Sequence, residues 1–318
     1  MTDIQKTPFV RELASSDKKI RDKATESLTL FLRSRTDLSL LELLKLWKGL
    51  FFCFYHSDRP LTQQALARNL SYSLVPTLPR TAVHRFLRAF WITIGRDFHS
   101  LDRLRLDKYL FLVRCYVGVA FEIFVKGAQQ NAAQNKGGDK KRKREEAGQK
   151  AKKRSKGKKQ SEEREDEEEG QQNDETKWAG LESYISIMEE GPLCPLNFDP
   201  DQPPADEKND YIPMPHGPDG LRYHVMDIWI DELEKVLEFE EVGGDDDETK
   251  TRKPKGDVPI ELILRPIEKL RAESPYKPVR TRAQEALDDE RLIEWGFRTR
   301  KVDSDESDES DEEWGGFD

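Results

Sequence analysis

From residue 7 to residue 126, apolar residues recur at the 3.6-residue period of an α-helix with few interruptions. After Ser39, an expected N-cap, the helix is apolar nearly all round, which is typical of an interior helix. The alternation of β-branched and polar residues that marks strands is absent. This part of the chain therefore predicts an all-α fold, with helices at 17–33, 39–55, 61–77, 81–97 and 102–126.

The predicted helices pair as hairpins, and the second pair begins about 44 residues after the first, close to the roughly 40–47 residues of HEAT-like repeats. Ser16 is expected to cap the first helix and Pro60 to open the third. The two pairs show no sequence similarity to each other. The pattern predicts either a HEAT-like helical-hairpin array or an irregular helical bundle.

Helical patterning resumes near Trp178 and predicts further helices at 178–188, 220–239, 258–271 and 280–295. Pro266 is expected to kink or end the helix that contains it. The segment 191–220 holds eight prolines, which predicts an extended strap, and 243–257 is expected to be a charged loop.

Composition separates the helical regions from two charged segments. The chain is 36% hydrophobic and 36% charged, whereas globular chains average roughly 45–50% and 25%. The charged segments have too little apolar surface to offset the entropy of ordering. We therefore expect a basic helical domain at 1–128, a disordered basic-then-acidic insert at 129–175, an acidic helical segment with a Pro-rich strap at 176–302 that packs on the first domain, and a disordered acidic tail at 303–318.

Charge is distributed unevenly along a chain whose net charge is −9. Residues 1–128 carry a net charge of +9, and residues 176–302 carry −11. This asymmetry predicts that the halves attract each other or face different partners.

Cysteines and hydropathy indicate the compartment. Three cysteines do not form a disulfide framework, and no run of about 18 apolar residues is present. The N-terminus lacks the apolar core of a secretory signal. The sequence predicts a soluble intracellular protein without a membrane partner.

Motifs of enzyme chemistry are absent from the sequence. Cys53 and His56 are the only close Cys/His pair, and a zinc site needs four ligands. Glycine pairs occur only in charged or terminal segments, and no nucleophile motif is present. We therefore expect no catalytic residues, no cofactor and no metal.

Two charged motifs point to partners and modification. A two-cluster basic run is typical of a bipartite nuclear import signal read by an import receptor, and it also binds RNA phosphates. The acidic tail repeats Ser-Asp-Glu, a pattern that acidophilic kinases phosphorylate. The import or RNA-contact residues are Lys140, Lys141, Arg142, Lys143, Arg144, Lys152, Lys153, Arg154, Lys158 and Lys159, and the phosphorylation candidates are Ser304, Ser307 and Ser310.

Basic residues are also dense within the predicted helices between residues 80 and 114. Such a face grips phosphates without reading sequence, or pairs with the acidic second half or an acidic partner. The sequence leaves these alternatives open. The candidate partner or RNA surface comprises Arg85, Arg88, Arg96, Arg103, Arg105 and Lys108.

Three long blocks of the sequence carry a family resemblance: residues 47–67 (WKGLFFCFYHSDRPLTQQALA), 90–114 (FWITIGRDFHSLDRLRLDKYLFLVR) and 220–233 (GLRYHVMDIWIDEL). Together they resemble the eukaryotic ribosomal RNA processing protein 1 family. The resemblance implies an all-helical nucleolar protein and supplies no catalytic residues. The positions within its signature blocks are Ser57, Asp58, Arg59, Pro60, Gln63, Gln64, Asp102 and Asp107, which we expect to cap helices and lock neighbouring hairpins.

The resemblance also implies a function and partners. We expect a non-catalytic assembly factor of the large-subunit (pre-60S) precursor that works among assembly factors, ribosomal proteins and precursor rRNA. Two alternatives are a nuclear transport adaptor and a metal-dependent nuclease. The nuclease requires a cluster of metal-binding acids that the sequence does not show.

Overall fold

The computed structural model describes residues 12–13, 15, 17–130, 177–197, 201–206, 208–242 and 251–298. Within these residues helices predominate and the only sheet is a two-stranded hairpin, so the predicted all-α class is confirmed. None of the helices described is both long and apolar enough to span a bilayer. The basic run from Lys140 to Lys159 and the tail serines fall outside the described residues.

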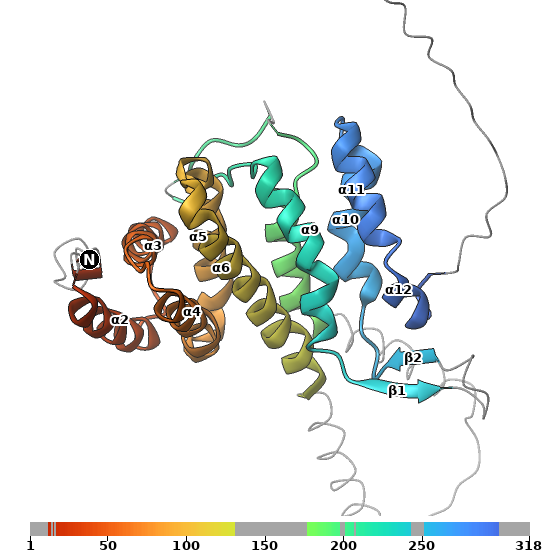
Figure 1. Cartoon of the computed structure of the whole chain (residues 1–318), viewed down its shortest axis with the longest axis horizontal. Coiled ribbons are helices and arrows are strands. Elements are labelled where there is room, and N and C mark those ends of the chain that lie inside the picture. The colour runs from red at the N-terminus through yellow and green to blue at the C-terminus, as the bar shows by residue number, and fades with distance from the viewer. Residues whose placement is uncertain are drawn as a thin grey trace, which may run out of the picture.

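The first half is an array of five long helices joined by short turns (Figure 1). Helix α3 packs on α5, and α4 packs on α6, so alternate helices are neighbours as in stacked hairpins. The elements are α2 (Lys18–Arg33), α3 (Leu40–Tyr55), α4 (Pro60–Arg68), η2 (Asn69–Ser73), η3 (Val75–Thr77), α5 (Arg80–Asp97), η4 (Phe98–Ser100), α6 (Arg103–Phe121) and η5 (Glu122–Lys126).

Local sequence signals set most helix starts in this half. Ser39 and Glu42 form the capping box of α3, and Pro60 is the first residue of α4, as predicted. The N-cap of α2 is Asp17, one residue later than the predicted Ser16, because the Asp17 carboxylate accepts the Lys19 N–H at 2.8 Å.

An aromatic cluster around Trp47 forms the core of the array. The Trp47 ring lies 5.1 Å from Phe86, 5.0 Å from Phe90 and 5.3 Å from Tyr116 between ring centroids. Its Nε1–H donates to the Phe86 carbonyl at 3.2 Å. The predicted interior helix α3 is therefore buried along most of its circumference, although Leu41 and Phe52 remain exposed.

The second half contains a helix at 177–190, the strap, α9 (Asp219–Glu234), β1 (Phe239–Val242), β2 (Thr251–Pro254), α10 (Ile260–Glu273), α11 (Lys277–Leu287) and α12 (Glu290–Glu294). Three expectations were wrong here. Helix α9 ends at Glu234, five residues early, and β2 lies inside the predicted charged loop. The predicted helix at 280–295 is two helices, because Asp289 accepts the Arg291 N–H and starts α12. Of the two outcomes expected at Pro266, an end of the helix is excluded, because α10 continues through it to Glu273.

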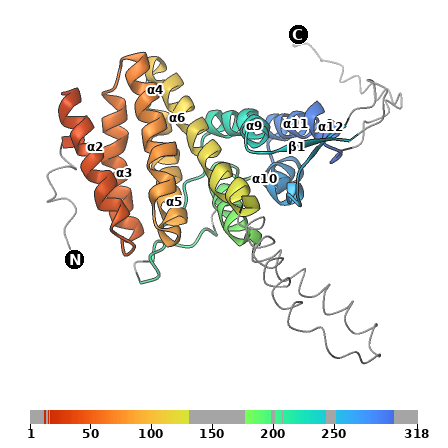
Figure 2. The ribbon, with the colours of Figure 1, turned by 90° about the horizontal axis from the view of Figure 1, so that it is seen from below.

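The two halves share one core where α9 packs on α6. The Trp229 ring of α9 meets Phe121 of α6 at 4.9 Å, and its Nε1–H donates to the Ile263 carbonyl of α10 at 3.0 Å. Figure 2 shows α2 to α6 side by side, followed by α9 and the C-terminal helices. The array therefore continues from the first half into the second.

Candidate interaction surface at a corner of the helical array

Two blocks that are far apart in the sequence meet at one corner of the array. The first runs from the end of α3 to the start of α4, and the second opens α6. We call residues 55–61 and 102–108 the signature corner. Its polar residues divide into an inner set that ties helices together and an outer set that faces solvent.

Lys108 is the centre of the inner set. Its side chain is 3% exposed, and its ammonium donates to the carbonyls of Tyr55 at 2.8 Å and Ser57 at 3.1 Å. It also donates to Asp58 Oδ1 at 3.2 Å. These bonds join α6 to the turn between α3 and α4, and they satisfy backbone carbonyls beyond the end of α3.

Asp102 and Arg105 form the second tie. The Asp102 carboxylate caps α6 by accepting the Arg105 N–H at 3.0 Å, and it accepts a further bond from Arg105 Nη1 at 2.6 Å. The Tyr55 hydroxyl donates to the same carboxylate at 3.3 Å. The Arg105 guanidinium lies 4.3 Å from the Tyr55 ring centroid, within cation–π range. Asp102 thus caps α6 and contacts α3, whereas Arg59 gives α4 no side-chain cap.

These contacts shift the protonation equilibria of the corner. The hydrogen bond from Arg105 holds the pKa of Asp102 below its usual value. Burial, the largest single influence, raises the pKa of Asp58, but hydrogen bonds and charge from Lys108 and Arg105 together lower it by more. Burial lowers the pKa of Lys108 against the opposing effect of Asp58. The shifts thus favour the charged form of both carboxylates, whereas burial disfavours the charged form of Lys108.

The outer layer of the corner is apolar as well as polar. Leu61 is 82% exposed and Leu104 is 92% exposed, each in the first turn of its helix. Among the signature positions Ser57 is buried and Gln63 is half-buried, whereas Asp58, Arg59, Pro60, Gln64 and Asp107 are exposed. The helical pattern of the sequence does not single out these two leucines, because only the packing shows that they face solvent.

Two residues of the predicted basic face, Arg85 and Arg88, pair with the acidic second half. Arg88 forms a bidentate pair with Glu190 at 2.5 and 2.6 Å and donates to the Ile212 carbonyl. Arg85 lies 3.2 Å from Asp210, which also accepts the Leu40 N–H at the start of α3. Four of the six candidates thus already have partners, because Lys108 and Arg105 belong to the inner set of the corner.

Arg114 continues this pairing on α6. Its Nε donates to Glu232 at 2.5 Å and its Nη2 to Asp231 at 2.8 Å. The Glu232 side chain is 2% exposed, so a buried carboxylate sits between the halves. Of the alternatives that the sequence left open, the structure thus shows intramolecular pairing for these arginines.

Arg96 and Arg103 are the candidates that remain available. Both are exposed, and neither forms an ion pair within the described part of the chain. Arg103 belongs to the corner, next to Leu104. The open surface at this corner therefore combines exposed leucines with two arginines, Arg59 and Arg103, that form no ion pair with the described residues.

The described residues also bear on the alternative of a metal-dependent enzyme. Among them, no group of three or more His, Cys, Asp or Glu side chains is placed to hold a metal ion. Asp97 and Asp102 instead bind Lys48 and Arg105. Asp58 likewise lies in ion pairs with Arg105 and Lys108.

The fold and this corner define an all-helical array protein whose charged residues mainly join its own helices. The chain matches the family model described as nucleolar protein, Nop52, over residues 4–137 and 208–315. It belongs to the Nop52 family of nucleolar proteins, which confirms the predicted family and the predicted nucleolar location.

Several curated proteins similar to this chain are named for ribosomal RNA processing. Human ribosomal RNA processing protein 1 homolog B is 27% identical over 233 residues, which is 72% of this chain and 22% of that protein. Mouse homolog B is 37% identical over 39% of this chain and 18% of its own length. Human homolog A is 36% identical over 36% and 26%, respectively. The chain spans about a quarter or less of these relatives.

Proposed function

We propose that this protein is a non-catalytic scaffold in the maturation of the large ribosomal subunit. It holds precursor rRNA and assembly factors in an arrangement that other enzymes process. The names of its relatives support a role in ribosomal RNA processing. The more specific part of the proposal is that the protein acts within the pre-60S particle.

The observation that carries the proposal is the signature corner. Four of its charged residues are engaged in the ties that hold the corner together, whereas Leu61 and Leu104 face solvent. The four are Asp58, Asp102, Arg105 and Lys108. Scattered exposed leucines are common, but these two stand in the first turns of helices that the same ion cluster holds in place. A rigid corner with exposed apolar side chains fits the docking of a protein partner.

The charged segments outside the described residues complete the proposal. The basic run from Lys140 to Lys159 supplies nuclear import and non-specific RNA affinity, which falls steeply with salt. Ser304, Ser307 and Ser310 accept phosphate, which adds negative charge to the tail. These assignments stay predictions.

The test depletes the protein from cells and restores it as variants. Depletion is expected to accumulate unprocessed large-subunit rRNA precursors, and the wild-type chain is expected to cosediment with particles that contain them. The double variant Leu61→Glu, Leu104→Glu places two charges on the corner and is expected to lose both cosedimentation and rescue. Leu30→Glu, on an exposed leucine of α2 that is 67% accessible to solvent, is the control and is expected to rescue.

Three results would contradict the scaffold. Rescue by the double variant would exclude the corner as the docking surface. Cleavage of precursor RNA by purified protein in magnesium, lost on substitution of one folded acid, would show a nuclease. Steady-state location at the nuclear envelope and cytoplasm would show a transport adaptor.

A further inference from the structure

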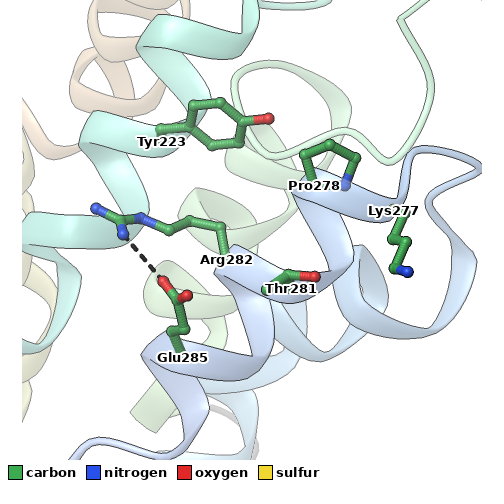
Figure 3. A pocket seen from close by; sticks show the side chains of 6 residues that line it. All are labelled: Tyr223, Lys277, Pro278, Thr281, Arg282 and Glu285. Carbon is green, nitrogen blue, oxygen red and sulfur yellow. Dashed lines mark hydrogen bonds and ion pairs between the residues drawn. The ribbon is translucent and has the colours of Figure 1, made fainter. Parts of the chain in front are cut away.

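A hollow of about 520 Å³ lies between α9 and α11, away from the signature corner. Figure 3 shows the six side chains that line it. Tyr223 of α9 forms one wall, and a stripe along α11 forms the other. The stripe consists of Lys277, Pro278, Thr281, Arg282 and Glu285.

The hollow is polar at both ends and carries opposite charges there. Lys277 is exposed and forms no ion pair with the part of the chain that the structure describes. Glu285 lies eight residues further along α11, which is about 12 Å along the helix axis. Lys277 and Glu285 thus mark a positive and a negative end.

Arg282 stiffens the negative end. Its Nε donates to Asp227 of α9 at 2.8 Å, and its Nη1 donates to Glu285 at 2.9 Å. This bridge joins α9 to α11 and fixes the Glu285 carboxylate, which keeps accepting capacity on its second oxygen. The wall that faces Tyr223 is therefore held in one position before any ligand arrives.

A single-stranded nucleotide matches this arrangement from end to end. Its phosphate suits the Lys277 ammonium, its base has a flat face for the Tyr223 ring, and its exocyclic amino group suits a carboxylate acceptor. An acidic peptide would match Lys277 but would meet a carboxylate at the other end. We infer that this hollow binds one nucleotide of single-stranded precursor RNA, with the phosphate at Lys277, the base on Tyr223 and an amino-bearing base edge at Glu285.

This inference rests on the proposed function, since it names the RNA contact of the scaffold. The probes are fluorescent ten-nucleotide oligo(A), oligo(C) and oligo(U), and the readout is the dissociation constant of the full chain by fluorescence anisotropy. A second background, with the bases between Lys140 and Lys159 replaced by Gln, removes binding by the insert. The matched control is Lys19→Ala, an exposed α2 lysine without an ion pair in the described residues.

Each variant has a distinct expected result. Tyr223→Ala weakens binding about 5- to 100-fold, and Tyr223→Phe, which keeps the ring, stays within about twofold of the wild type. Lys277→Ala weakens the binding of all three RNAs. It also lowers by about one the slope of the logarithm of the binding constant against the logarithm of the salt concentration. Glu285→Ala weakens the binding of oligo(A) and oligo(C), whose bases carry amino groups, and leaves the binding of oligo(U) unchanged.

Two outcomes would overturn the inference. One is wild-type RNA binding by both Tyr223→Ala and Lys277→Ala. The other is an oligo-glutamate peptide that binds in a Lys277-dependent and Tyr223-independent manner. Either outcome leaves the proposed scaffold function standing if the chain still cosediments with precursor particles. If the wild-type chain does not cosediment with them, the scaffold function is contradicted whatever the hollow binds.

Discussion

The signature corner and the interface between the halves both engage basic residues of the first half, but with different partners. At the corner Lys108 is held chiefly by backbone carbonyls of the neighbouring turn. At the interface Arg88 and Arg114 meet carboxylates more than 100 residues away. Basic residues of the first half therefore join neighbouring helices at the corner, and they join the two halves of the chain at the interface.

The interface also lies deeper in the molecule than the outer corner. Glu232 is buried between Arg114 and Lys235, which donate to it at 2.5 Å each. A buried carboxylate is tolerated when it is paired and hydrogen-bonded. We therefore expect the interface to make folding of the two halves cooperative, and the corner to shape one surface.

The largest effect is expected from Trp229→Ala at the interface. This change removes the contact with Phe121 and leaves the Ile263 carbonyl without its donor. We expect a loss of about 3–5 kcal/mol in the free energy of unfolding, in a single transition. Urea denaturation followed by circular dichroism and tryptophan fluorescence measures the free energy of unfolding and the number of transitions. Two separated transitions would show that the halves unfold independently.

Gly118→Ala tests how closely α6 approaches the π-helical turn η2 and α9. A Cβ at this position would lie 2.1 Å from the Tyr72 hydroxyl and 2.8 Å from Glu232 Oε2. We expect a loss of about 1–3 kcal/mol from overpacking. Adding Tyr72→Phe removes the nearest atom and is expected to restore part of the loss. A double variant no more stable than Gly118→Ala would contradict the close contact.

Lys108→Met examines the corner alone. The methionine keeps an apolar stem but leaves the Tyr55 and Ser57 carbonyls without their donor, at a cost of about 1–3 kcal/mol. Thermal unfolding measures the loss, and Lys19→Ala is the exposed control with no expected change. An unchanged melting temperature would show that solvent replaces the buried ammonium.

The smallest effect is expected in the pH dependence of Asp102. Its pKa is lower in the folded chain than in the unfolded chain, because Arg105 donates to it. The resulting stability is present above the unfolded pKa of about 3.9 and is lost as pH falls through the folded pKa. The difference in melting temperature between wild type and Asp102→Asn should be constant at pH 5–7 and shrink below pH 4.

Asp107→Asn is the control for that titration. Asp107 is exposed on the same helix and makes no hydrogen bond or ion pair with the described residues. Its substitution should leave the pH profile of the wild type unchanged. If the difference in melting temperature between wild type and Asp102→Asn is as large at pH 3 as at pH 5–7, the role of the carboxylate charge is contradicted.

The sequence alone determined the helices of the first half, because their period and their caps are local. Ser39 with Glu42 and Pro60 specify helix starts without reference to the rest of the chain. The residues of the signature corner were also predictable, since they lie in blocks that resemble a known family. Charge asymmetry predicted that the halves attract each other or face different partners, and the ion pairs of Arg88 and Arg114 show the attraction.

Only the tertiary structure decided which residue of each charged set faces which partner. Arg88 is paired and Arg96 is open, although both are arginines of the same helix, because helix rotation and the course of the strap select one of them. Strand β2 likewise exists because β1 is placed beside it, and its sequence reads as a loop. Pairing across more than 100 residues depends on packing that no local pattern encodes.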